Sequence, residues 1–211
     1  MECDALIFDL DGTLWDAAHA TAQGLNNGLE EAGLGHLRVS ARQVTGVLGL
    51  PFSECVARLF PTLPPASLDG LPEILDRHER LAVQELGGTP CAGVEEALPA
   101  LQDAYPLLIV SNCQNWYLEA FLSGSGLGGY FSGWECHGTS GLPKARNIAL
   151  VAERHGLQRP VYVGDTATDQ QAAREAGVAF LFAAWGFGEP EGECTAFSSF
   201  AELAAGLLTA T

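Results

Sequence analysis

The sequence predicts an α/β fold: a doubly wound, mostly parallel sheet with an α-helical cap domain inserted near its beginning. Short apolar runs alternate with segments of helical character along most of the chain. Three of these runs stop at polar residues, and the stretch 15–86 interrupts the alternation with helix-like segments alone. The alternation favours right-handed crossovers between parallel strands, and the interruption favours an inserted domain.

Four apolar runs are expected to form buried parallel strands. They lie at 6–8, 105–110, 161–163 and 178–182. The first stops at Asp9, the second at Ser111 and the third at Gly164-Asp165. Ligands of doubly wound sheets bind beyond the carboxyl ends of the strands. One crevice is therefore expected to gather Asp9, Ser111 and Asp165, although they lie far apart in the sequence.

Helices are expected between and after these strands, at 94–102, 115–122, 144–155, 169–176 and 200–208. The insertion supplies further helical segments at 17–32, 53–60 and 68–86. We therefore predict an α/β core made of 1–14 and 87–211, and a helical insertion at 15–86. Gly87-Gly88 suits a hinge between them, because glycine adopts backbone angles that other residues avoid. The alternative is one continuous domain with a long helical edge.

Composition limits what the chain can bind and where it works. Ten basic and 26 acidic side chains give a net charge of −16, which argues against nucleic acids and anionic membranes as partners. No apolar run approaches the roughly 18 residues of a membrane span, and the first residues are acidic. The six cysteines lack the spacing of a zinc site. We expect a cytoplasmic protein with reduced thiols that acts on a small molecule.

Two carboxylates stand two residues apart where the first strand ends, in Asp9-Leu10-Asp11-Gly12-Thr13. Acids this close repel one another unless a cation or a proton lies between them. The glycine permits a tight turn, and the threonine adds a hydroxyl. A plain turn or helix cap is the alternative, because Asp, Gly and Thr are common in both.

A second acidic pair, Asp165 and Asp169, follows the third strand and leads into a helix. As alternatives, Asp165 caps that helix and Asp169 complements its dipole. The two pairs together offer oxygen ligands at strand ends, which suit a hard divalent ion that keeps several waters. The sequence therefore favours Mg²⁺ over zinc at this edge of the sheet.

Two further segments suit an anionic ligand. Ser111-Asn112 offers a hydroxyl and backbone N–H groups that enter a helix, which fits phosphate oxygens, with a plain helix cap as an equal alternative. Lys144 is the only lysine, and it opens a helix, where a cation opposes the helix dipole. A structural helix favours an acid at this position, so Lys144 indicates an anion to be neutralised.

In this order and spacing, the four segments resemble the haloacid dehalogenase superfamily, specifically its phosphatases with a helical cap after the first strand. The resemblance covers the whole chain. It rests on the motif at 9–14 together with Gly164-Asp165 and Asp169, while Ser111 and Lys144 are weaker signals at matching positions. It implies a Rossmann-like core and a Mg²⁺-dependent hydrolase.

The resemblance also implies a role for each motif residue. Asp9, already ionised at neutral pH, would attack phosphorus, and Asp11 would protonate the leaving group and then activate water. The Asp9 side chain, the Asp11 carbonyl and Asp165 would bind Mg²⁺, with Asp169 acting through water or from outside the ligand shell. The groups implied to neutralise the phosphoryl oxygens belong to Thr13, Ser111, Asn112 and Lys144.

The sequence argues against some functions other than phosphate hydrolysis and leaves others open. Asp11 argues against a dehalogenase, and an insertion without lysine argues against a phosphonate-cleaving relative. A sugar phosphomutase of the same superfamily is an alternative, and a noncatalytic or receiver-type signalling module is another. Phosphoglycolate is the first substrate expected, before nucleoside monophosphates and sugar phosphates. Arg38 and Arg42 are candidate cations for a substrate carboxylate, and the loop 45–51 is a candidate for selectivity.

Overall fold

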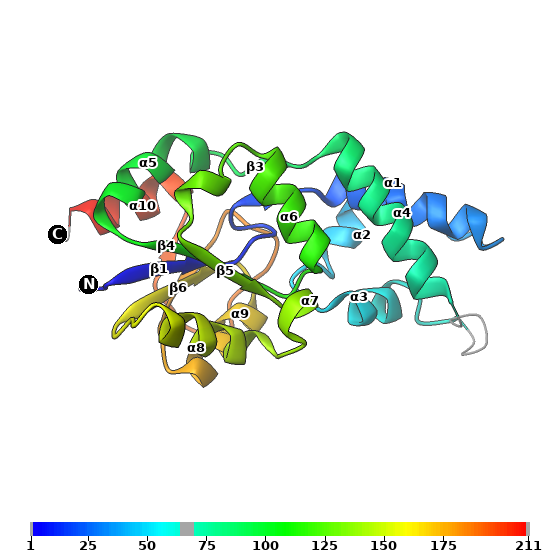
Figure 1. Cartoon of the computed structure of the whole chain (residues 1–211). Helices are drawn as coiled ribbons and strands as arrows, with labels where there is room; N and C mark the ends of the chain where they lie inside the picture. Colours follow the sequence, from blue (N-terminus) through cyan, green and yellow to red (C-terminus); the bar gives the residue numbers. More distant parts are fainter. Residues whose placement is uncertain (1, 64–69, 210–211) are drawn as a thin grey trace.

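The chain folds around a six-stranded sheet covered by helices on both faces, as the computed structural model shows (Figure 1). The structure describes residues 2–63 and 70–209. The strand order is β5-β4-β1-β6-β7-β8, and neighbouring strands run parallel. The predicted α/β class with a doubly wound parallel sheet is confirmed.

The central strands are buried on both faces, which explains their continuous apolar sequences. Leu6 and Phe8 of β1 pack into the core cluster on one face, and Ala5 and Ile7 pack into the cluster on the other. The strands are β1 (Ala5–Phe8), β4 (Leu107–Ser111), β5 (Gly133–Cys136), β6 (Pro160–Gly164), β7 (Ala179–Ala183) and β8 (Ala196–Phe197). The sequence analysis missed β5 and β8, which are the two edge strands.

Helices from the core cover the two faces of the sheet. On one face lie α5 (Val94–Ala104), α6 (Asn115–Gly124) and α10 (Phe200–Leu208), and on the other lie α8 (Lys144–Arg154) and α9 (Ala167–Ala176). These five were expected, with ends within three residues. Two one-turn segments, η2 (Gly128–Tyr130) and α7 (His137–Ser140), flank β5 and were not expected.

The insertion forms a helical lobe beyond the carboxyl ends of the strands, on the side away from both termini (Figure 1). Its helices are α1 (Ala18–Glu31), α2 (Ala41–Thr45), α3 (Phe52–Leu59) and α4 (Leu71–Leu86). Leu25, Leu29 and Leu75 belong to an apolar cluster of its own. Gly24 brings α1 close to α4, because a Cβ there would lie 2.5 Å from the Cα of Glu79. Residues 68–69 of the expected last helix lie outside the described residues.

The expectation that 15–86 contains no strand is wrong at one point. Trp15–Asp16 forms β2, which pairs antiparallel with β3 (Thr89–Pro90) and joins the two ends of the insertion. Gly88 is required by close approach, since a Cβ there would lie 2.8 Å from the Trp15 ring. Gly87 has a φ of +69°, in the left-handed region. That the insertion moves as a separate domain about Gly87 stays a prediction.

None of the described helices has the length and apolar character needed to cross a membrane.

Candidate active site

The carboxyl edge of the sheet carries the predicted site residues. Asp9 and Asp11 follow β1, Ser111 ends β4, and Asp165 follows β6. Because β1 pairs with both β4 and β6, these three loops are neighbours. The other predicted residues are Thr13, Asn112, Lys144 and Asp169, and none of the eight is more than 6% exposed. Side chains that sequence places up to 160 residues apart thus lie at one buried edge.

Lys144 joins the first acidic pair to the second. Its Nζ donates to Asp9 Oδ1 at 2.9 Å and to Asp169 Oδ1 at 2.6 Å. Burial alone would lower the pKa of Lys144, but Asp169 and Asp9 outweigh burial and raise it above its ordinary value. A buried charge needs such partners. Lys144 is therefore positively charged in the folded protein. The sequence predicted that it neutralises an anion, and here it contacts the carboxylates of Asp9 and Asp169.

Three carboxylates form a group that fits a divalent cation. Ligand oxygens of Asp9, Asp165 and Asp169 lie within 4.8 Å of one another. Asp9 Oδ2 is buried without a hydrogen-bond partner. Burial, and then Asp169, raises the pKa of Asp9 and also that of Asp165, the latter to about 7. A cation would offset this repulsion among three carboxylates, so the residues present fit the predicted Mg²⁺.

Burial and positive charge act on Asp9 in opposite directions. Burial raises the pKa of Asp9, while Lys144 lowers it and favours the ionised carboxylate that we expected. That Asp9 is ionised at neutral pH when it attacks phosphorus stays a prediction.

Asp165 is held by groups from two separate loops. Its Oδ1 accepts from Thr13 Oγ1 at 3.1 Å, and its Oδ2 accepts from the backbone N–H of Phe187 at 2.7 Å. Gly12, at φ +77°, makes room for this carboxylate, because a Cβ there would lie 2.3 Å from Asp165 Oδ2. Thr13 was expected to face phosphoryl oxygens, and here its hydroxyl orients Asp165. Its contact with phosphate stays a prediction.

Asp169 lies in the first turn of α9, as the structural alternative expected, and its role beside a metal stays a prediction. Its Oδ2 accepts from Thr166 N at 3.0 Å and from Thr166 Oγ1 at 2.6 Å, as part of a capping box at the start of α9. Its Oδ1 accepts from Lys144. One oxygen of Asp169 therefore caps the helix, while the other accepts a hydrogen bond from Lys144 beside Asp9.

Asp11 turns its side chain toward α6 rather than toward Lys144. Tyr117 Oη donates to Asp11 Oδ1 at 2.6 Å, and burial raises the pKa of Asp11 to about 7. A group with a pKa near neutrality suits proton transfer in both directions. The sequence analysis missed Tyr117, because a tyrosine on the apolar face of a helix is typical of a core residue.

Ser111 and Asn112 follow β4 beside this cluster. Ser111 Oγ accepts from the backbone N–H of Cys113 at 3.3 Å, as in a helix-capping turn. Asn112 Nδ2 donates to the carbonyl of Gly49 at 2.8 Å, which links the core to the insertion. Their expected contacts with phosphoryl oxygens stay predictions.

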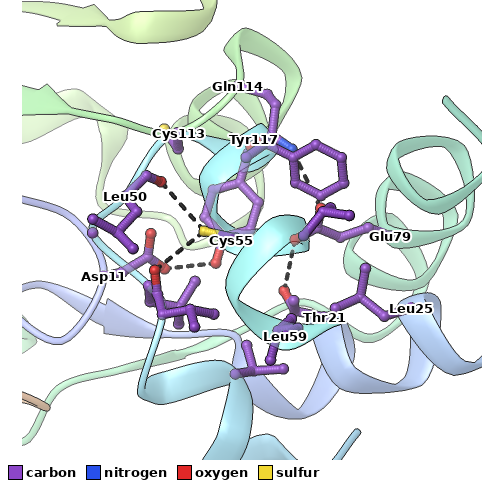
Figure 2. Close-up of a pocket in the computed structure, with 16 residues that line it drawn as sticks. Asp11, Thr21, Leu25, Leu50, Cys55, Leu59, Glu79, Cys113, Gln114 and Tyr117 are labelled. Atoms are coloured by element: carbon purple, nitrogen blue, oxygen red, sulfur yellow. Dashed lines mark hydrogen bonds between the residues drawn. The ribbon is translucent and has the colours of Figure 1, made fainter. Parts of the chain in front are cut away.

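A buried acid on the insertion faces the same region. Glu79 of α4 is 3% exposed, and it accepts from Thr21 Oγ1 at 3.0 Å and from Gln114 Nε2 at 3.3 Å (Figure 2). Burial raises the pKa of Glu79 to about 8. The sequence analysis missed it, because one acid in a helix rich in charged residues is typical of a solvent-facing position.

Glu79 should make the stability of the protein depend on pH. Its pKa is raised from 4.5 to about 8, so the stabilisation is complete below pH 4.5 and is lost as pH rises toward 8. Glu79→Gln removes this contribution. As pH rises, the free energy of unfolding of the variant should therefore decline less steeply than that of the wild type, by up to about 1.4 kcal/mol per pH unit. Denaturant unfolding of both proteins between pH 5 and 8 measures the two slopes. Equal slopes would show that Glu79 is not held in its protonated form.

Comparison with known sequences reveals a clear family resemblance. The sequence pattern of the family described as haloacid dehalogenase-like hydrolase matches residues 6–183. The phosphoglycolate phosphatase of Agrobacterium fabrum is 33% identical over 192 residues, which cover 86% of this chain and 80% of that protein. The phosphoglycolate phosphatase of Xylella fastidiosa is 34% identical over 197 residues, with the same coverage.

Solved structures share the fold along the full length. A protein from Haemophilus somnus, described as a predicted phosphoglycolate phosphatase, has a TM-score of 0.83 at 22% identity and covers 100% of this chain and 99% of its own. A haloacid dehalogenase-like family protein from Streptococcus pneumoniae has a TM-score of 0.82 at 22% identity, covering 99% and 98%. At this identity the likeness concerns the fold alone.

Proposed function

The chain belongs to the haloacid dehalogenase-like hydrolases and is a phosphatase of that family; we propose that it hydrolyses a small-molecule phosphate monoester through an aspartyl phosphate on Asp9. The observation that carries this proposal is the environment of the two carboxylate oxygens of Asp9. One of its oxygens is held by Lys144, and the other is buried and unpartnered at the end of β1. An oriented carboxylate with a free oxygen is equipped to act as a nucleophile.

In the proposed first step, Asp9 Oδ2 attacks phosphorus and the bond from phosphorus to the leaving-group oxygen breaks. Asp11 gives its proton to that oxygen, so that an alcohol departs. In the second step, Asp11 takes a proton from the water that attacks phosphorus, and phosphate leaves with Asp9 restored. The near-neutral pKa of Asp11 supports its use in both directions.

Mg²⁺ is the proposed cofactor, held by the side chains of Asp9 and Asp165 and the backbone carbonyl of Asp11, with Asp169 next to them. When bound, the ion neutralises charge on the phosphoryl oxygens. Lys144 adds a fixed positive charge beside Asp9, and Thr13, Ser111 and the backbone N–H of Asn112 complete the proposed phosphate site.

Removal of Mg²⁺ is expected to lower phosphate release by more than about a hundredfold, because the charge on the phosphoryl oxygens then lacks the cation that neutralises it. Excess chelator tests this, with restoration by added Mg²⁺. A second readout does not need turnover: Mg²⁺ should raise the unfolding temperature of the wild-type chain and raise that of Asp165→Asn less. Undiminished phosphate release in chelator would refute the metal proposal.

The proposed substrate is a small phosphate ester, and phosphoglycolate, the substrate in the relatives' names, is the first to assay. Release of free phosphate, rather than an isomerised sugar phosphate, separates a hydrolase from a phosphomutase. A net charge of −16 supports a small molecule as partner in place of nucleic acid or an anionic membrane. The six free cysteines support the further proposal of a cytoplasmic location.

A further inference from the structure

Resting on the proposed phosphatase activity, we infer that the substrate is a small phosphate ester whose leaving group carries no negative charge and binds beside Glu79. Phosphoglycolate, whose leaving group carries a carboxylate, is then a poor substrate for this chain. The inference rests on the position, lining and charge of one cavity.

The cavity lies between the core and the insertion (Figure 2). Asp11, Gln114 and Tyr117 line it from the core, and helices α1 to α4 line it from the insertion. Asp9 does not line it. Because Asp11 is the proposed proton donor to the leaving-group oxygen, the cavity that Asp11 shares is the place where the leaving group would lie.

The wall that the insertion contributes is mainly aliphatic. It includes Leu25, Val47, Leu50 and Val56. Val47 and Leu50 belong to the loop 45–51, which the sequence analysis singled out for selectivity, and Asn112 ties this loop to the core through Gly49. An aliphatic wall offers no hydrogen bonds to an ionic group, so it favours a leaving group without charge.

No cation is available to this cavity. None of the 16 lining residues is a lysine or an arginine. All ten lysine and arginine residues of the chain lie within the described residues, so none is hidden at 64–69. The two arginines expected to receive a substrate carboxylate do not line this cavity: Arg38 pairs with Glu30 at the surface, and Arg42 is exposed.

Two acidic side chains, those of Asp11 and Glu79, line the cavity. The burial that raises the pKa of Glu79 to about 8 penalises a negative charge at this position. A substrate carboxylate would meet the same penalty. A hydroxyl can both donate to and accept from a carboxyl group, so it fits beside Glu79.

The size of the cavity indicates a small leaving group. Its volume is about 30 Å³, room for roughly two water molecules. We therefore expect a leaving group of only a few heavy atoms, with a hydroxyl group toward Glu79.

Two matched esters test the inference directly. Phosphoglycolate and 2-hydroxyethyl phosphate have the same two-carbon leaving group, which ends in a carboxylate in one and in a hydroxymethyl group in the other. We expect kcat/KM of the wild-type protein to be at least about tenfold higher for 2-hydroxyethyl phosphate, because burial penalises the charged carboxylate and not the hydroxymethyl group.

Glu79→Gln examines the part played by Glu79. The variant keeps an oxygen to accept from Thr21 but cannot become negative. Above pH 8, where Glu79 of the wild type is ionised, the preference for 2-hydroxyethyl phosphate should therefore narrow by at least about threefold in the variant, mainly through a lower KM for phosphoglycolate. Asp76→Asn is the matched control. Asp76 lies on the same helix and accepts from Gln114 at 3.2 Å and from Trp116 at 3.0 Å, but it does not line the cavity. The preference of Asp76→Asn for 2-hydroxyethyl phosphate over phosphoglycolate should equal that of the wild type.

The outcomes separate this inference from the proposed function. Hydrolysis of phosphoglycolate as fast as that of 2-hydroxyethyl phosphate would overturn the inference and leave the phosphatase standing. An unchanged preference in a folded Glu79→Gln would overturn the role of Glu79. Absence of phosphate release from these esters, nucleoside monophosphates and sugar phosphates alike would overturn the proposed function, and the inference with it.

Discussion

Replacement of Asp9 with asparagine is expected to lower kcat by at least about 10⁴-fold while the protein stays folded. The amide has nearly the same shape as the carboxyl group but is a very poor nucleophile toward phosphorus. Lys144 keeps its hydrogen bond to Asp169, so the neighbouring groups retain a partner. Phosphate release under saturating substrate measures the loss.

The fold of the variant should be at least as stable as the wild type. Asp9 lies in a buried group with Asp165 and Asp169, and removal of one charge relieves repulsion. Asp103→Asn, which changes an exposed acid on α5, is the matched control and should keep wild-type activity. Residual activity of Asp9→Asn above a few per cent of wild type would rule out Asp9 as the nucleophile.

Replacement of Asp11 with asparagine is expected to lower the rate of the first turnover by about 10²- to 10⁴-fold for an alkyl phosphate. An amide cannot supply the proton that the departing alkoxide needs. The loss should be much smaller for p-nitrophenyl phosphate, whose leaving group is stable as an anion. Release of the leaving group in a single turnover measures this step without interference from the second one.

The comparison of the two leaving groups makes this experiment specific. A merely structural role for Asp11, exercised through its hydrogen bond with Tyr117, would slow both esters equally. An equal loss would therefore contradict proton donation by Asp11. A large loss for the alkyl ester alone would support it.

The fold could be predicted from the sequence where burial is strongest. Strands β1, β4, β6 and β7 were predicted because layers of helices bury both of their faces, which requires continuous apolar sequence. The edge strands β5 and β8 were missed for the opposite reason. β5 exposes Trp134, 47% accessible, and β8 has two residues, so neither carries a long apolar run.

The acidic part of the site could also be predicted from the sequence, because parallel strands place their carboxyl ends at one edge of the sheet. That geometry alone brings Asp9 and Asp165 together once β1 and β6 are neighbours. The hydrogen-bond partners of individual side chains could not be predicted from the sequence. Thr13 donates to Asp165, and Asn112 donates to Gly49, and both choices depend on contacts between separate loops.

The residues that sequence reasoning missed owe their position to packing between distant elements. Tyr117 reaches Asp11 because α6 packs beside the loop after β1, and Glu79 is buried because Gly24 lets α1 approach α4. The N–H of Phe187 that holds Asp165 belongs to the backbone and leaves no trace in side-chain chemistry. A lone acid or tyrosine in a helix has no neighbours in the sequence that indicate these contacts.

The central claim is that the phosphoryl group passes through Asp9, and the most direct measurement is to trap it there. The protein would be quenched with acid during turnover of 2-hydroxyethyl phosphate in Mg²⁺, digested and analysed by mass spectrometry. We expect a phosphoryl group on the peptide that contains Asp9, absent from Asp9→Asn and lost when the substrate is exhausted. A phosphoryl group on another residue, or sustained phosphate release by Asp9→Asn, would contradict the account.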